Sequence, residues 1–277
     1  MNKQHIFLLS LLTLILLSTF GLAQDPDKLS VPLSDPARPA FLKVSILNGS
    51  ITVKGTGGNE VTVEANSRSS DEDGAGNEDK KRGLRRIPNT STGLQVEEDD
   101  NEVTVSTGYM SSGRTVNLVI QVPTNTSMKL STLNDGDVKV ENVTGDIEVS
   151  NLNGAVTLDN ISGSAVVDAL NENINVVFAK VDQKKSMSFS SMNGEIDVTF
   201  PPDVKATMRL KNDMGEIYSD FDIKMDYKAT KVEDKGQGKI GKKKISMEKM
   251  MTGAINGGGV DILFKNFNGD IFIRKGK

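Results

Sequence analysis

Apolar and polar residues alternate along most of this chain, and glycine interrupts the alternation at regular intervals. Between residues 133 and 178 the glycines stand at positions 136, 145, 154 and 163, and Glu172 occupies the next position of the series. We call these five residues the anchors of the pattern. Apolar residues, mostly valine and isoleucine, stand two and four positions after each anchor. Such alternation is typical of β-strands, and glycine after asparagine, threonine or serine is typical of turns. Each nine-residue unit therefore predicts one short strand and one corner.

The corners alternate in kind, so that two units make one true repeat of 18 residues. This period predicts a coil of two strands and two corners, with successive coils stacked about 4.8 Å apart. We expect Asn134, Asn153 and Asn171 to form a ladder along one edge, and Thr144 and Ser162 to share the other. An asparagine ladder could be a ligand-binding edge, but turn geometry and amide stacking already account for these residues. The apolar columns between the two edges are expected to form the core.

The same pattern, a glycine followed by apolar residues at the second and usually the fourth position, recurs outside this block at Gly49, Gly194, Gly215, Gly258 and Gly269. Apolar residues stand two positions before many of the anchors, and we assign them to the same strands: Leu47, Val143, Leu152, Ile161, Leu170, Met192 and Phe267. The sequence thus predicts an all-β, single-domain, parallel β-solenoid (β-helix-like) with about 18 residues per coil in the regular block and two charged insertions.

The first 23 residues have the features of a signal peptide. Lys3 precedes an apolar run over residues 6–20, and small residues lead to a predicted cleavage between Ala23 and Gln24. The run is shorter than the roughly 20 residues of a membrane span, although an uncleaved anchor is the alternative. We expect an exported protein, periplasmic or at the cell surface or extracellular, with no membrane span after signal removal. The chain has no cysteine, so disulfides do not stabilise it.

The mature chain is expected to begin with an extended, proline-rich lead-in over residues 24–40, followed by one domain over residues 41–277. Polar, charged insert loops are predicted at about residues 66–93 and 222–252. The second insert carries a lysine cluster that is the candidate partner surface: Lys235, Lys239, Lys242, Lys243 and Lys244. Such a cluster could contact anionic lipid headgroups or acidic glycans, or it could be a solvated loop that protects a sheet edge.

The residue inventory excludes most catalytic chemistry. The single histidine, His5, lies in the signal peptide, so histidine-based triads and zinc sites are excluded, as are cysteine nucleophiles. A net charge of −4 gives no support for nucleic-acid binding. Calcium binding would need stacked acids, but Asp137 aligns with Ala155 and Asp146 with Ser164. With no tryptophan and three tyrosines, a sugar-cleaving groove has little support. We predict no catalytic, cofactor-binding or metal-ligating residues, and no cofactors.

The stretch over residues 120–163, together with residues 255–275, resembles the exported bacterial putative-adhesin family of β-strand-repeat proteins. Val122-Pro123, Asn153-Gly154, Thr144-Gly145-Asp146 and Asn268-Gly269-Asp270 carry the resemblance. It implies a right-handed β-solenoid at the cell envelope or surface, and it implies no functional residues. The predicted function is a non-enzymatic adhesin-like binding or envelope scaffold module for an unidentified glycan or protein ligand. The alternative is a calcium-binding or polysaccharide-acting β-helix protein that works through carboxylates.

Overall fold

The computed structural model describes residues 27–69, 80–81, 84–85, 92–107, 114–134, 136–226, 231–234, 245–248 and 250–277. These residues contain strands and no helix, so the predicted all-β class is confirmed. Twenty strands pair into one sheet. The strands of the first half of the chain are β1 (Asp27–Pro32), β2 (Ala40–Asn48), β3 (Ile51–Thr56), β4 (Glu60–Ser69), β5 (Lys80–Lys81), β6 (Leu84–Arg85), β7 (Gln95–Asp99), β8 (Glu102–Ser106), β9 (Arg114–Pro123), β10 (Thr126–Asn134) and β11 (Val138–Glu141).

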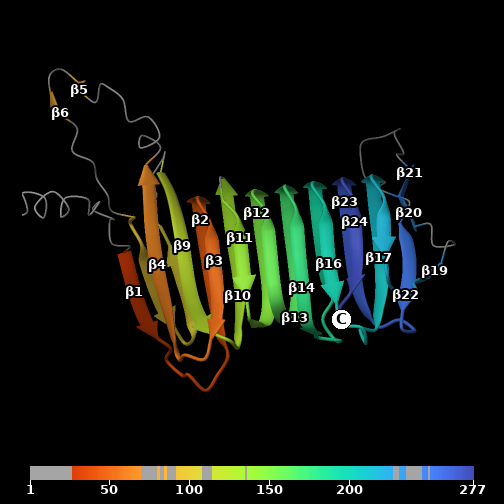
Figure 1. Cartoon of the computed structure of the whole chain (residues 1–277), viewed down its shortest axis with the longest axis horizontal. Helices are drawn as coiled ribbons and strands as arrows, with labels where there is room; N and C mark the ends of the chain where they lie inside the picture. The colour runs from red at the N-terminus through yellow and green to blue at the C-terminus, as the bar shows by residue number, and fades with distance from the viewer. Residues whose placement is uncertain are drawn as a thin grey trace, which may run out of the picture.

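The strands of the second half are β12 (Thr144–Asn153), β13 (Val156–Asn171), β14 (Ile174–Val181), β15 (Met187–Asn193), β16 (Ile196–Phe200), β17 (Ala206–Met214), β18 (Ile217–Ser219), β19 (Lys224–Asp226), β20 (Lys231–Asp234), β21 (Ile245–Glu248), β22 (Met251–Ile255), β23 (Val260–Asn268) and β24 (Ile271–Lys275). β5 pairs only with β6, and β20 only with β21. The other strands stand side by side in a long row (Figure 1).

The large sheet forms two facing layers. The first layer runs β7–β8–β2–β10–β12–β13–β15–β23–β17–β22–β19. The second runs β1–β4–β9–β3–β11–β13–β14–β16–β24–β18, so the long strand β13 contributes to both. The core lies between the layers. Phe178 and Phe200 of the second layer contact Phe189 of the first, with ring centroids 6.4 Å apart in each pair.

The pairing register follows the period of the sequence in the regular block. Val138 lies opposite Val156, and Val156 lies opposite Ile174, each 18 residues further along the chain. Thr144 lies opposite Ser162, as predicted for the second edge. The polar turn before β15 then lengthens the step, so that Val166 pairs with Ser188. Corner glycines thus come to lie over corner glycines, and apolar residues over apolar residues.

Parallel strands in chain order make up the regular block but do not extend over the whole sheet. The strands are mixed, with antiparallel pairs at both ends of the row, such as β1–β4 and β7–β8 at one end and β17–β22 at the other. The order also departs from the chain: β2 and β3 lie between β8–β9 and β10–β11, and β23 and β24 lie between β15–β16 and β17–β18 (Figure 1). Gly258 lies in a turn, as predicted, with a φ of 85°, but this turn links β22 and β23 on opposite sides of β17 rather than two strands of one coil.

This arrangement has a physical reason. A terminal strand pair placed inside the row forms hydrogen bonds on both sides, which a pair added at the end could not do. The antiparallel strands then cover the edges of the parallel part, and covered edges do not pair with other chains. The lead-in contributes to the same protection, since β1 pairs antiparallel with β4 rather than remaining an unpaired extended segment.

Glu172 occupies the glycine position of its corner with a backbone φ of 100°. This region is costly for any residue with a Cβ atom. We expect Glu172→Gly to raise the free energy of unfolding by about 1 kcal/mol, because it removes this backbone strain. Urea denaturation measures the change. Glu195→Gly is the control, since Glu195 follows its corner glycine and has no positive φ. A Glu172→Gly protein no more stable than the wild type would contradict the strain.

Glu98 fastens the lead-in to the turn between β7 and β8. Its Oε1 accepts hydrogen bonds from the backbone N–H of Ser34 and of Asn101, both at 2.9 Å, and its Oε2 accepts one from Ser34 Oγ at 2.9 Å. These bonds, the one from the Ser34 N–H foremost, lower the pKa of the Glu98 carboxyl below its ordinary value. A lowered folded-state pKa stabilises the protein above the unfolded-state pKa, and the contribution is lost as pH falls through the folded-state value.

We therefore expect Glu98→Gln to melt at a lower temperature than the wild type at pH 7. The gap should narrow as pH falls below the ordinary glutamate pKa and close as pH falls through the lower folded-state pKa of Glu98, where the wild-type carboxyl takes up its proton. Thermal melts followed by circular dichroism across pH 3–8 measure both curves. A gap that is the same at every pH would show that the charge of Glu98 contributes nothing.

Candidate binding surface

The outward side chains of the first layer form three columns that run across the strands. The serine column comprises Ser45, Ser131, Ser150, Asp168, Ser190, Lys265 and Lys211, each in register with the next. The mixed column lies two residues before it and comprises Lys43, Lys129, Glu148, Val166, Ser188, Leu263 and Arg209. The apolar column lies two residues after it and comprises Leu47, Leu133, Leu152, Leu170, Met192 and Phe267.

The apolar column faces solvent. Leu133, Met192 and Phe267 are 42%, 48% and 47% exposed, and Leu47 and Leu170 are exposed as well. These residues therefore lie outside the core, whereas Val143 and Ile161, at the same position of the nine-residue pattern on the other edge, are buried. The strands of the first layer run without a break to the asparagine corner, so alternation directs these residues outward.

The opposite corner contains a residue that reverses the alternation. Asn142 and Asn160 adopt left-handed backbone angles, with φ of 58° and 52°, and Asn160 Nδ2 donates to Asn142 Oδ1 at 2.6 Å. One left-handed residue turns the chain so that the next side chain points into the core. Asparagine tolerates this conformation better than most residues. The two edges thus treat the same apolar position in opposite ways.

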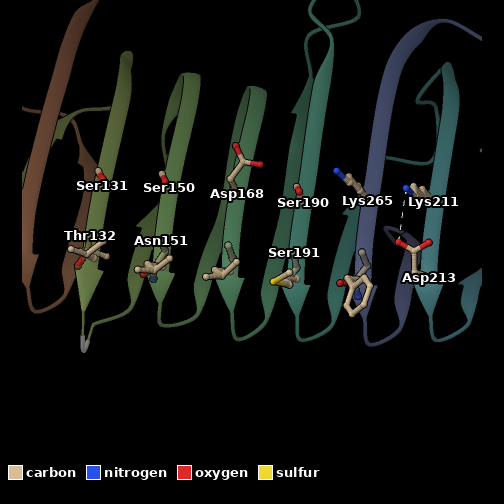
Figure 2. A pocket seen from close by; sticks show the side chains of 17 residues that line it. Ser131, Thr132, Ser150, Asn151, Asp168, Ser190, Ser191, Lys211, Asp213 and Lys265 are labelled. Carbon is tan, nitrogen blue, oxygen red and sulfur yellow. Dashed lines mark ion pairs between the residues drawn. The ribbon is translucent and has the colours of Figure 1, made fainter. Parts of the chain in front are cut away.

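A groove of about 560 Å³ lies on the first layer, bordered by the serine and apolar columns of five neighbouring strands and reaching β17. Figure 2 shows Ser131, Ser150, Asp168, Ser190, Lys265 and Lys211 side by side across these strands. The groove is polar on one side and apolar on the other. It changes along its length from neutral serines to the cationic Lys265 and Lys211, the latter 4.0 Å from Asp213.

The predicted asparagine ladder borders the apolar column and is confirmed. Asn153 Nδ2 lies 3.5 Å from Asn134 Oδ1, and Asn171 Nδ2 lies 2.9 Å from Asn153 Oδ1. The ladder is longer than predicted, since Asn134 donates to Asn48 Oδ1, Asn193 to Asn171 Oδ1, and Asn268 to Asn193 Oδ1. Because the amide groups bond to one another along the column, support of the edge accounts for these residues without a ligand.

A second polar column lies buried beneath the groove, where alternation predicts apolar residues. Thr132 Oγ1 donates to the carbonyl of Gly49, Asn151 Nδ2 to that of Gly136, and Asn266 Nδ2 to that of Gly194. These bonds satisfy corner carbonyls that face the neighbouring strand. The corresponding signal in the sequence is a polar residue two positions before most of the ladder asparagines, which the glycine and apolar pattern alone does not reveal.

The predicted partner lysines, Lys235 to Lys244, lie outside the described residues, as do Ala23 and Gln24 of the predicted cleavage site. Asp137 and Asp146 lie apart in register, as expected, and both have partners. Asp137 Oδ1 accepts the Ala155 N–H at 2.9 Å. Burial alone would raise the pKa of Asp146, but hydrogen bonds from Lys185 and Ser164 hold it below its ordinary value. Over the described ranges, three or more acidic, histidine or cysteine residues nowhere gather as a metal site.

No protein-family model matches the chain, and no curated protein matches it significantly. In the part of the chain that the structure describes, no helix is long and apolar enough to cross a membrane. Three solved bacterial structures show a distant likeness. A putative cell adhesion protein from Clostridium sporogenes ATCC 15579 is 12% identical, with a TM-score of 0.40, over 91% of this chain and 100% of that one.

A putative adhesin from Bacteroides fragilis NCTC 9343 is 11% identical, with a TM-score of 0.32, over 91% of this chain and 98% of that one. A putative lipid binding protein from Parabacteroides distasonis ATCC 8503 is 9% identical, with a TM-score of 0.27, over 92% and 98% of the two chains. At these TM-scores the likenesses do not identify a ligand or an activity for this chain.

Proposed function

We propose that this protein is an exported, non-enzymatic binding module that engages its partner through the outer face of the first layer. The observation that carries the proposal is the apolar column, which exposes large side chains in one line beside a groove. Soluble monomers rarely expose a contiguous apolar patch of this kind without an interaction to cover it. The serine column beside it supplies hydroxyl, carboxylate and ammonium groups that can select the partner.

The fold favours such a role. A row of stacked strands presents regularly spaced side chains on a rigid surface, and rigid surfaces lose little conformational entropy on binding. We further propose that the repeated strand pairs wind as a right-handed solenoid, because crossovers between parallel strands are almost always right-handed. This hand agrees with the one that the family resemblance implies. Export is proposed from the signal peptide, and mass spectrometry of the mature N-terminus of protein recovered from the periplasm or medium tests it.

The binding face is tested by a double variant, Met192→Ser with Phe267→Ser, which removes two members of the apolar column. The matched control is Val177→Ser, since Val177 is 42% exposed but lies on β14 in the second layer. The probes are phosphatidylglycerol vesicles, purified peptidoglycan sacculi and immobilised wild-type protein. We expect retention on at least one probe to fall about tenfold or more for the double variant alone. No retention on any probe, or equal losses in the control, would contradict the proposal.

A further inference from the structure

We infer that the partner of this face is a second copy of the chain, docked about a two-fold axis that runs along β15. The inference rests on the proposed function, because it names the occupant of the same surface. An axis parallel to the strands reverses their order and keeps each column facing itself. β15 then meets β15, β13 meets β23, and β12 meets β17 of the partner.

This axis pairs opposite charges that lie on either side of β15. Asp168 is one strand to one side of Ser190, and Lys265 is one strand to the other side. Both side chains are exposed, and two strand spacings, about 10 Å, separate them within one copy. The rotation places Asp168 of each copy opposite Lys265 of the other. The contact therefore forms twice.

The same axis pairs a second set of charges further out. Glu148 of β12 and Arg209 of β17 both belong to the mixed column, two strands from β15 on opposite sides. Glu148 has Lys129 at 2.6 Å, and Arg209 has Asp261 at 3.4 Å, within one copy. Docking would join these two pairs into a four-residue network with alternating charge, which occurs once at each end of the interface.

The apolar positions match as well. Val166 faces Leu263 of the partner strand, Leu170 faces Phe267, and Met192 faces its own copy on the axis. Val166, Leu170, Met192 and Phe267 are exposed in the single chain, between 37% and 48%. Their mutual burial would remove half of the apolar column, and Val166 of the mixed column, from water, and burial of apolar surface is the principal favourable term in association. Apolar side chains at the axis with charges around them resemble the usual core and rim of an interface.

Other ways of placing the axis lose this match. An axis one half-strand towards β13 sets Lys265 against Ser150 and Glu148 against Leu263. An axis one half-strand towards β23 sets Asp168 against Lys211, but it also sets Val166 against Arg209 and Leu170 against Asp213. An axis along the row of strands sets Asp168 against Asp168 of the second copy. Of these placements, the one along β15 is the one that matches both charge pairs, Asp168 with Lys265 and Glu148 with Arg209.

The size of the face sets the expected affinity. Seven strands of about six residues give a patch of roughly 30 by 20 Å, or about 1,200 Å² buried on both copies together. This is the low end for specific interfaces, so we expect a dimer that dissociates on dilution rather than a permanent one. One unfavourable contact is included, because Leu152 faces Asp213, which lies 4.0 Å from Lys211.

Sedimentation velocity of the mature protein from about 1 to 200 µM measures the self-association. We expect a monomer–dimer equilibrium for the wild type, at least about tenfold weaker for Asp168→Lys and for Lys265→Asp, because each change creates two like-charge contacts. The double variant Asp168→Lys with Lys265→Asp exchanges the charges and should restore the wild-type affinity. Asp159→Lys on the second layer is the control and should change nothing.

A wild type that stays monomeric throughout this range would overturn the inference, and so would a double variant that is no tighter than the single ones. The two proposals fail separately. If the charge variants leave association unchanged while Met192→Ser with Phe267→Ser still releases the protein from vesicles or sacculi, the face binds another partner. If neither set of variants changes any binding, the proposed function fails with the inference.

Discussion

Gly154→Ala is expected to lower the free energy of unfolding by about 3 kcal/mol or more, enough to unfold a large fraction of a marginally stable domain. Gly154 has a φ of 154°, and a Cβ atom at this position would lie 2.2 Å from the carbonyl oxygen of Gly136 in the neighbouring coil. That atom belongs to the backbone, which moves only if the neighbouring corner moves. Urea denaturation followed by circular dichroism measures the loss.

Gly57→Ala is the matched control, because nothing lies within 4 Å of a Cβ atom built on Gly57. We expect it to be neutral or slightly stabilising, since alanine restricts the unfolded chain more than glycine does. Equal losses for the two variants would show that corner glycines are not packed against the next coil. The stacking registers described for β12 on β10 and for β13 on β11 would then be wrong.

Phe189→Ala is expected to cost about 3–5 kcal/mol of stability, the range for a large buried aromatic residue. Phe189 is fully buried on β15, and its ring centroid lies 5.2 Å from that of Phe264 and 6.4 Å from those of Phe178 and Phe200. These four rings come from both layers, so the truncation would leave a cavity that neither layer can close alone. The cavity would lie beneath the serine column of the binding face.

Phe41→Ala controls for the loss of an aromatic residue from a strand, because Phe41 lies on β2 and is 37% exposed. We expect a loss below about 1 kcal/mol there. If Phe189→Ala costs no more than Phe41→Ala, the core between the layers is not packed around the phenylalanine cluster. Thermal unfolding of both variants under one buffer condition gives the comparison.

The corners were the most predictable part of the fold. A glycine with a left-handed backbone angle leaves a strong mark on a sequence, because few other residues adopt that conformation. The asparagine ladder followed from the corners, and Asn134, Asn153 and Asn171 lie where the 18-residue period placed them. Even Glu172 was recognisable as a corner without glycine, and its φ of 100° agrees.

The order of the strands in the sheet could not be predicted from the repeated pattern of glycine and apolar residues. Every coil has the same pattern of glycine and apolar residues, so the pattern fits β23 against β15 as well as β17 against β15. Which strand becomes the neighbour depends on the connections and on the two ends of the row, where β22 pairs antiparallel with β17 and β7 pairs antiparallel with β8. Repeats with the same pattern of residues fix the register in which neighbouring strands pair, but they do not fix the order of the strands in the sheet.

The binding face was hidden for a related reason. Period-two alternation shows which residues share a side of a strand but does not show which side is the core. Leu170 and Ile161 occupy the same position of the nine-residue pattern, yet Leu170 is exposed and Ile161 is buried. The left-handed Asn160 before Ile161 decides the difference. An asparagine also precedes Leu152 on the other edge, where its φ is not positive, so the residue type alone does not separate the two edges.

The most direct test of the binding face uses single-cysteine variants, since the chain has no cysteine of its own. Met192 lies at the proposed two-fold axis, so Met192→Cys places two thiols opposite each other across the roughly 10 Å that separates packed sheets, a gap that a short bismaleimide cross-linker spans. Val177→Cys, similarly exposed on the other layer, is the control. With this cross-linker at micromolar protein, we expect a covalent dimer of Met192→Cys, and no comparable dimer of Val177→Cys, on denaturing gels. Equal cross-linking of the two variants, or none of Met192→Cys, would contradict the account.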